Sequence, residues 1–120
     1  LLHDDDEAHQ RAMDLTTRQP FHILTTCWVL TELADGLCTV QSRHLFQKTL
    51  ESLRAQPAVT IVGPDADVFD AAIDLYFRRP DKEWSLTDCT SFVVMHKQNI
   101  AEALTGDRHF EQAGFKALLK

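Results

Sequence analysis

Short strand-like segments alternate along this chain with longer segments of helical periodicity, and this alternation restricts the possible folds more than any other feature. Phe21 to Thr26 (FHILTT) and Val59 to Val62 (VTIV) have the length and the apolar, β-branched character of buried strands. Gly63-Pro64 closes the second of them. Strands that alternate with helices form parallel sheets covered on both faces. We therefore predict an α/β fold, a three-layer α/β/α sandwich with a mainly parallel central sheet.

The remaining segments are assigned from the spacing of their apolar residues. In the helix predicted to end near Phe77, the inward-facing residues are expected to be Phe69, Ala72, Ile73 and Tyr76. Trp84 to Thr87 and Leu104-Thr105 are predicted to be short strands, and residues 108–120 a loop followed by a weak strand or helical turn. Helices are predicted over residues 6–18, over 28–40, from the cap Ser42 past Leu53, from Asp65 or Asp67 to Phe77, and from Asp88 past Met95.

Length and cysteine usage narrow the class of protein. A chain of 120 residues suits one domain, which can bury a core without disulfide or metal staples. No apolar run approaches the ~18 residues that a membrane-spanning helix needs. Cys27, Cys38 and Cys89 are odd in number and form no CxxC pair, which argues against a zinc site or a disulfide framework. We expect buried free thiols and a cytoplasmic protein.

The charge balance is acidic. The chain has 12 Lys and Arg against 18 Asp and Glu, a formal net charge of −6. Proteins that grip nucleic acid by charge alone are usually basic. Either nucleic acid is not the ligand, or the acidic residues are concentrated for another purpose. A carboxylate cluster that holds Mg²⁺ or Mn²⁺ is one such purpose, and binding of a basic partner peptide is another.

Three acidic residues are expected at one edge of the predicted sheet. Glu32 lies one turn into the helix after the first predicted strand, and Asp88 and Asp107 follow two later ones. Taken singly they are a solvated helix carboxylate, a helix N-terminal acid and a turn aspartate. Together they would repel one another, and a divalent cation removes that cost. Such a site supports metal-assisted phosphodiester hydrolysis. The six histidines show no HxH or HExxH spacing, so each is predicted to be a surface or capping residue.

Three segments resemble a known family. Trp84 to Phe92 (WSLTDCTSF) is similar to the catalytic-helix motif of PIN domains, and Ala103 to Phe110 (ALTGDRHF), with Gly114-Phe115 after it, to their final acidic motif. Thr25 to Glu32 resembles the segment that delivers the family's second acid. The resemblance spans nearly the whole chain. It implies that Glu32, Asp88 and Asp107 are the metal-site carboxylates and catalytic residues, with Thr87 and Thr105 as polar neighbours.

The resemblance also implies a function. Small prokaryotic PIN proteins of the VapC type are Mg²⁺- or Mn²⁺-dependent endoribonucleases, toxins that are silenced by a cognate antitoxin and usually form homodimers. An acidic protein fits a basic antitoxin tail. Arg78, Arg79, Lys82 and Arg108 are close enough in sequence to the motifs to contact RNA phosphates. The alternatives are a catalytically inactive PIN-fold binding module and, less favoured, a DNA-directed or general phosphodiesterase.

The start of the chain departs from the family pattern. Leu1-Leu2 resembles the end of a first strand, and the family's first aspartate precedes such a pair. Asp4, Asp5 and Asp6 follow it, in a turn, where they are not expected to replace that residue. We therefore expect residues 1–120 to be a single PIN-like domain that lacks its first strand. Such a chain is expected to be poorly stable, inactive or completed by residues upstream.

Overall fold

The computed structural model describes residues 22–119, and the helix predicted over residues 6–18 lies outside them. Within the described part, no helix combines the length and the apolar character needed to cross a bilayer. The elements are, in chain order, β1 (Ile23–Thr26), α2 (Cys27–Gly36), α3 (Arg43–Ala55), β2 (Val59–Val62), α4 (Ala66–Arg78), α5 (Leu86–Lys97), β3 (Glu102–Ala103), α6 (Arg108–Gln112) and β4 (Lys116–Ala117).

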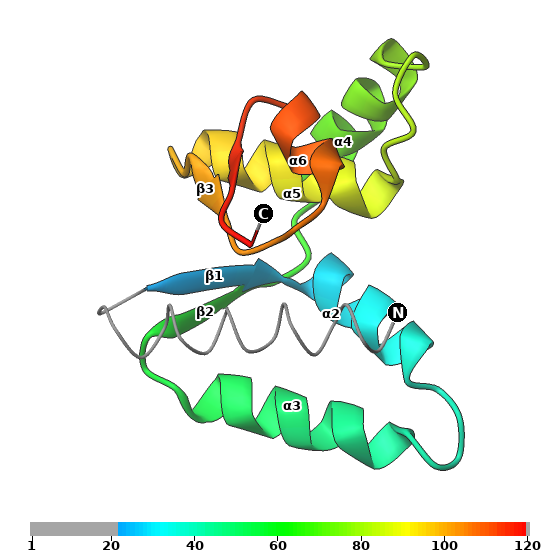
Figure 1. The fold of residues 1–120 in the computed structure, drawn as a ribbon, viewed down its shortest axis with the longest axis vertical. Helices are drawn as coiled ribbons and strands as arrows, with labels where there is room; N and C mark the ends of the chain where they lie inside the picture. The colour runs from blue at the N-terminus through cyan, green and yellow to red at the C-terminus, as the bar shows by residue number, and fades with distance from the viewer. Residues whose placement is uncertain (1–21, 120) are drawn as a thin grey trace.

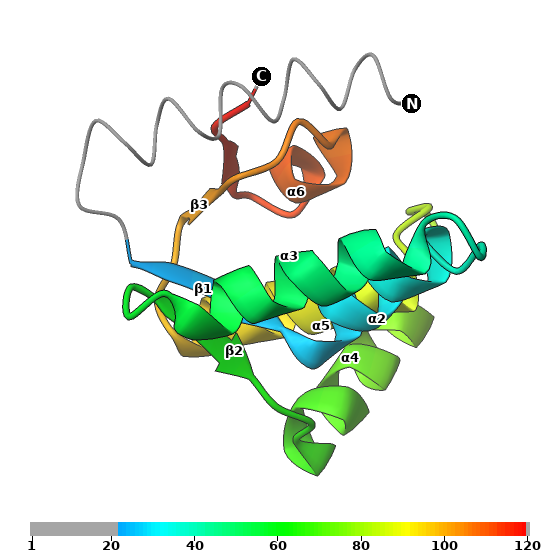
Figure 2. The same ribbon diagram turned by 90° about the horizontal axis from the view of Figure 1, so that it is seen from below.

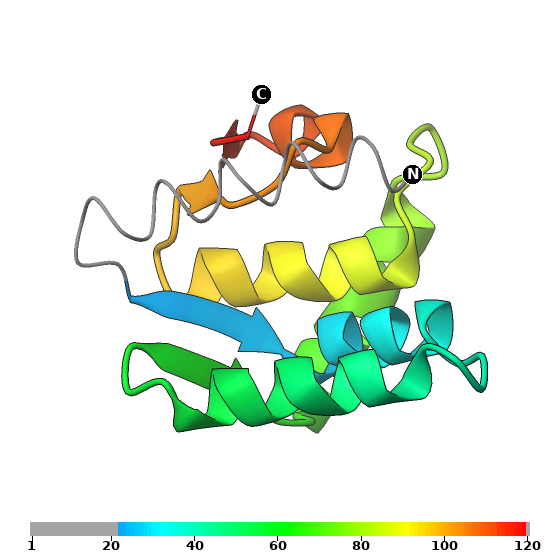
Figure 3. The same cartoon turned by 60° about the horizontal axis from the view of Figure 1, so that its bottom comes forward.

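The strands pair in parallel, as predicted. β1 pairs with β2 over their full length, from Ile23 opposite Val59 to Thr26 opposite Val62. β3 pairs with β4, again in parallel. Among residues 22–119 these are two separate two-stranded sheets rather than one continuous sheet. In Figures 1 and 3 the β1–β2 pair lies between α3 and α5, so helices cover both of its faces.

The helices arrange the C-terminal half around one core. α4 and α5 form the most extensive interface between elements, and α5 also contacts α2 and α6. Figure 2 shows β3, β4 and α6 gathered at one end of the molecule, with α4 at the opposite end. Phe92 on α5 is 1% exposed, and its ring makes edge-to-face contacts with Trp84 and Phe110, both at 5.0 Å between centroids. Phe115 lies against it at 5.6 Å. This aromatic core holds α6 and the loop before α5 on the body of α5.

Several boundaries differ from prediction. Trp84 to Thr87 is not a strand: Ser85 is the N-cap of α5, because its side chain and that of Asp88 form a capping box that favours a helix start. Leu104-Thr105 lies after β3, which ends at Ala103. The helix predicted over residues 28–40 begins at Cys27 and ends at Gly36.

The predicted inward face of α4 is half correct. Ala72 is fully buried, as expected, but Phe69 and Tyr76 are exposed. The core on that side is filled instead by Trp84 and Cys89 of the segment that packs against α4. The helix itself was predicted correctly. It starts after Asp65, which caps it by accepting hydrogen bonds from the Asp67 and Val68 backbone N–H groups.

Candidate metal centre

Asp88 is held at the first turn of α5. Its backbone N–H donates to Ser85 Oγ at 2.9 Å, and its Oδ2 accepts from the Ser85 N–H at 3.1 Å. This reciprocal pair satisfies two N–H groups that a helix start leaves without a partner. The positive end of the helix dipole favours an ionised carboxylate at this position. Helix formation by Ser85 to Lys97 therefore also fixes where the Asp88 carboxylate lies.

Asp107 occupies the N-cap of α6, a second helix start. Its Oδ1 accepts from the His109 backbone N–H at 2.9 Å. Its own N–H donates to Thr105 Oγ1 at 3.1 Å, so the threonine predicted to be a polar neighbour orients the backbone before the cap. The two aspartates thus come from two helix N-termini that the core brings together.

His109 joins the two carboxylates. Its Nδ1 lies 3.0 Å from Asp88 Oδ2 and 3.5 Å from Asp107 Oδ1. The side chains of His109 and Asp88 are only 20% and 16% exposed, whereas that of Asp107 is 44% exposed. One ligand atom from each of the three residues lies within 4.8 Å of the others. The cluster is therefore a small, partly shielded group of oxygen and nitrogen donors, open to solvent on the Asp107 side.

The donor set fits a divalent cation. Carboxylate oxygens suit Mg²⁺ and Mn²⁺, and these ions commonly use few carboxylates and keep several waters. Two anionic groups brought this close repel each other, and a cation between them offsets the cost.

Glu32, the third predicted carboxylate, is not part of this cluster. It is an exposed residue in the middle of α2, a helix that contacts α5. Thr87 is half-buried in the first turn of α5, next to Asp88. The structure thus brings Asp88 and Asp107 together, and the role of Glu32 stays a prediction.

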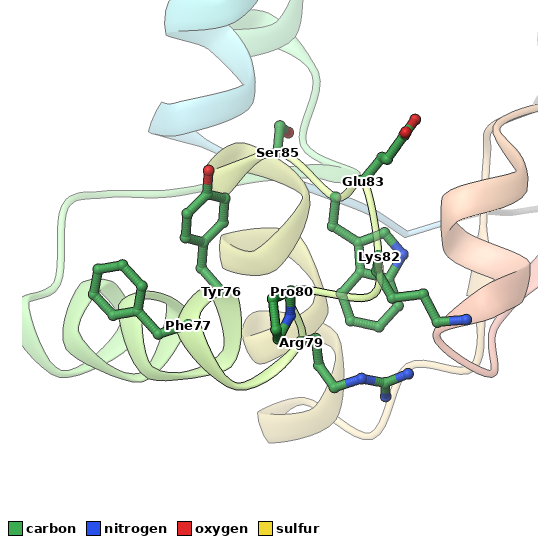
Figure 4. A pocket seen from close by; sticks show the side chains of 8 residues that line it. Tyr76, Phe77, Arg79, Pro80, Lys82, Glu83 and Ser85 are labelled. Atoms are coloured by element: carbon green, nitrogen blue, oxygen red, sulfur yellow. The ribbon is translucent and has the colours of Figure 1, made fainter.

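Two cavities adjoin the cluster. A polar cavity of about 250 Å³ is lined by His109 and by Lys82, Arg108, Asp81, Glu83 and Gln112. Lys82 and Glu83 also line a larger cavity of about 490 Å³, which reaches Ser85 of the capping box and is drawn in Figure 4. On its other side Tyr76 and Phe77 project from the end of α4 (Figure 4). The smaller cavity therefore adjoins the cluster at His109, and the larger one reaches Ser85, the capping partner of Asp88.

Arg79, one of the residues predicted to contact RNA phosphates, already forms an ion pair with Asp81. Arg79 donates two hydrogen bonds to Asp81, at 3.0 and 2.9 Å, and its guanidinium lies over the Trp84 ring at 5.3 Å. The Arg79 hydrogen bond lowers the pKa of the exposed Asp81 carboxyl to about 2. Arg79 therefore braces the loop between α4 and α5, which leaves Lys82 and Arg108 as the cations that line the cavity beside His109.

His109 was not predicted as a site residue. The sequence contained one signal for it, the spacing Asp-x-His in Asp107 to His109. When an aspartate caps a helix, its side chain accepts from the backbone N–H two or three positions later. In this spacing, His109 is therefore expected in the first turn of the helix, close to the Asp107 carboxylate. The absence of HxH and HExxH spacing excluded only the metal motifs that use two histidines, and did not address a single histidine beside two carboxylates.

Comparison with known proteins identifies the family. A family model described as "PIN domain" matches residues 1–116. This chain belongs to the PIN domain family. The resemblance expected from the motifs around Asp88 and Asp107 is thereby confirmed, and those motifs are where this PIN domain builds its carboxylate cluster.

Known relatives match this PIN domain over most of its length and most of their own. Two curated proteins, both named "23S rRNA-specific endonuclease VapC20" and coming from two strains of Mycobacterium tuberculosis, are 30% identical to it over 110 residues, 92% of this chain and 83% of theirs. The crystal structure of Mycobacterium tuberculosis VapC20, described as a sarcin-ricin loop cleaving toxin, superimposes with a TM-score of 0.74 at 30% identity. The match covers 89% of this chain and 82% of the other. The predicted PIN-like α/β fold is confirmed.

The buried neighbour of Asp88 in this PIN domain is a thiol. Cys89, on α5, is fully buried. The expectation of buried thiols is wrong for Cys38, which is exposed, and Cys27 is only half-buried. Burial, and secondly the negative charge of Asp88, raise the pKa of the Cys89 thiol. A neutral, buried thiol is a poor nucleophile, so Cys89 serves to pack the core.

Proposed function

We propose that this chain is a Mg²⁺- or Mn²⁺-dependent endoribonuclease that hydrolyses RNA phosphodiester bonds as the toxin of a toxin–antitoxin pair. One observation carries the proposal: in a PIN domain, Asp88 and Asp107 reach from two helix starts so that one ligand atom of each lies within 4.8 Å of the other, beside a polar cavity lined by His109. Two convergent carboxylates suit a cation and repel a bare phosphate, so the arrangement supports metal-assisted rather than purely basic recognition of RNA.

The protein's own residues divide the work. Asp88 and Asp107 would hold the cation, with Glu32 of α2 as the third carboxylate. A bound divalent cation polarises a phosphoryl oxygen and makes a water molecule a better nucleophile at neutral pH. The capping box keeps Asp88 in place before any ion arrives, so little reorganisation is needed when RNA binds.

Lys82 and Arg108 would contact the RNA backbone. Both line the cavity that His109 also lines, so a phosphate placed there lies near both cations and beside the residue that contacts Asp88 and Asp107. Arginine and lysine are the residues that most often contact phosphate. These two side chains compensate locally for the overall charge of −6. We therefore expect RNA affinity to depend on salt, with a modest slope that reflects few phosphate contacts.

The relatives suggest the substrate and partners to test first. VapC20 is named as specific for 23S rRNA and as a sarcin-ricin loop cleaving toxin. We infer that ribosomal RNA is the first substrate class to test for this chain, and that a cognate antitoxin binds it. The acidic balance supports an antitoxin with a basic segment. We also propose that the protein acts in the cytoplasm and forms a homodimer.

The experiment is cleavage of purified 23S rRNA by the full-length protein. Cleavage at discrete positions is expected with Mg²⁺ or Mn²⁺, none with EDTA, and recovery when either ion is returned in excess. Cleavage that persists in EDTA would contradict a metal-dependent mechanism. RNA binding without cleavage under every ion would instead support the catalytically inactive PIN-fold binding module.

A further inference from the structure

We propose that His109 is a positioning residue that fixes Asp88 and Asp107 relative to each other and so prepares the metal site. The inference rests on the proposed function, because it assigns a role within the same site. His109 is the one residue whose hydrogen bonds, among those of the described residues, reach both carboxylates. The two aspartates lie 19 positions apart in sequence, and each is held within its own segment by local caps alone.

One carboxylate oxygen of Asp88 receives two contacts from nitrogen atoms. Its Oδ2 accepts from the Ser85 N–H at 3.1 Å and lies 3.0 Å from His109 Nδ1. With Nδ1 protonated, two donors therefore fall on the same oxygen and set the rotation of the carboxylate. Oδ1 is then the oxygen that the carboxylate can offer to a cation. A histidine in this role orients a ligand without needing to be one.

Asp107 is held by the main chain of His109. Its Oδ1 accepts from the backbone N–H of His109, at 2.9 Å. The main chain of His109 thus holds one carboxylate while its side chain holds the other. Because α6 has only five residues, it is too short to be stable alone and depends on tertiary contacts for its position. The Nδ1–Asp88 bond is such a contact, next to the packing of Phe110 on Phe92.

Burial strengthens the link. The side chains of His109 and Asp88 are 20% and 16% exposed, so water competes poorly for their hydrogen bond. The neighbouring ring of Phe110 is anchored in the core, which limits how far α6 can move. Loss of the imidazole would therefore free the Asp88 carboxylate to rotate and allow α6 to shift, while the aromatic core stays in place.

The test compares Mn²⁺ binding by the full-length protein, measured from the EPR signal of free Mn²⁺, in wild type, His109→Ala and His109→Asn. Asparagine places an N–H donor near the position of Nδ1 and keeps the backbone donor to Asp107. His109→Ala is expected to weaken Mn²⁺ binding about 10- to 100-fold, the usual effect of losing an outer-shell partner. His109→Asn is expected to recover most of that loss.

Controls separate this role from others. His44→Ala removes an exposed histidine from α3 and is expected to bind Mn²⁺ like wild type. The inference is overturned if His109→Ala binds Mn²⁺ normally, or if His109→Asn is as weak as His109→Ala. A nitrogen coupling from imidazole in the pulsed EPR spectrum of bound Mn²⁺ would also overturn it, because His109 would then be a ligand. If wild type itself binds no Mn²⁺, the proposed function fails first, and this inference fails with it.

Discussion

At the scale of single residues, the site is built from side chains that have ordinary structural duties. Asp88 belongs to a capping box and Asp107 caps a five-residue helix, so each would be explained completely by helix stability. What distinguishes them is His109 Nδ1, 3.0 Å from one carboxylate and 3.5 Å from the other. Asp88 and Asp107 both stabilise helix starts, but they also lie close to each other, so their negative charges repel. A bound cation would offset that repulsion.

Glu32 is the residue whose role is most open to test. It is exposed on α2, and surface substitutions usually change stability by less than about 0.5 kcal/mol. If Glu32 is a metal carboxylate, Glu32→Gln should weaken Mn²⁺ binding about tenfold or more without lowering the thermal midpoint. Asp35→Asn, an exposed acid on the same helix, is the matched control and should leave binding unchanged. Equal Mn²⁺ affinity in Glu32→Gln and wild type would remove Glu32 from the site.

At the scale of elements, helix starts do the positioning. Ser85 and Ser42 are both N-cap residues, but only Ser85 uses its side chain to accept a backbone hydrogen bond. The start of α5 is therefore pinned by its sequence, whereas the start of α3 depends on its packing. Because Asp88 is part of the Ser85 capping box, the hydrogen bonds that stabilise the first turn of α5 also fix the position of the Asp88 carboxylate.

Ser85→Ala tests that coupling. Loss of the cap should lower the free energy of unfolding by about 1 kcal/mol, within the range of 0.5–2 kcal/mol measured for N-caps. Urea unfolding monitored by circular dichroism would measure it. Ser42→Ala should cost clearly less, since no side-chain cap bond is lost there. If the two substitutions cost the same, the capping box does not stabilise α5.

The elements also show what the sequence could and could not predict. β1, β2 and the bodies of α3, α4 and α5 were predicted from local signals: β-branched runs, proline stops and apolar spacing. Trp84 to Thr87 was misassigned because Trp and Leu resemble strand residues, while the Ser85–Asp88 capping box favours a helix start. The position of His109 depends on how α6 packs on α5, a contact between distant segments that no local pattern encodes.

At the scale of the whole molecule, one aromatic core supports the site. Phe92 of α5 contacts Trp84, Phe110 and Phe115, which come from the segments before α5, within α6 and before β4. Asp88 lies one turn before Phe92, and His109 directly precedes Phe110. The core therefore sets the distance between the two helix starts that carry the carboxylates.

Truncation of the core should be costly. Phe92→Ala is expected to destabilise the fold by about 3–5 kcal/mol, because a fully buried aromatic ring is replaced by a cavity. Phe77→Ala, at a phenylalanine that is 71% exposed, should cost far less. Chemical unfolding of both variants beside wild type gives the difference. Similar midpoints for the two variants would show that Phe92 is not central to the core.

The most direct test of the central claim is RNA cleavage by Asp88→Asn beside Asp65→Asn. Both substitutions remove one charge from an aspartate at a helix start, and each should cost at most about 1 kcal/mol of stability. Of these two aspartates, Asp88 lies in the carboxylate cluster and Asp65 does not. Asp88→Asn should lose Mg²⁺- or Mn²⁺-dependent cleavage by about 100-fold or more while remaining folded, and Asp65→Asn should cleave like wild type. Folded Asp88→Asn that cleaves RNA at the wild-type rate would contradict a metal-dependent site built on Asp88.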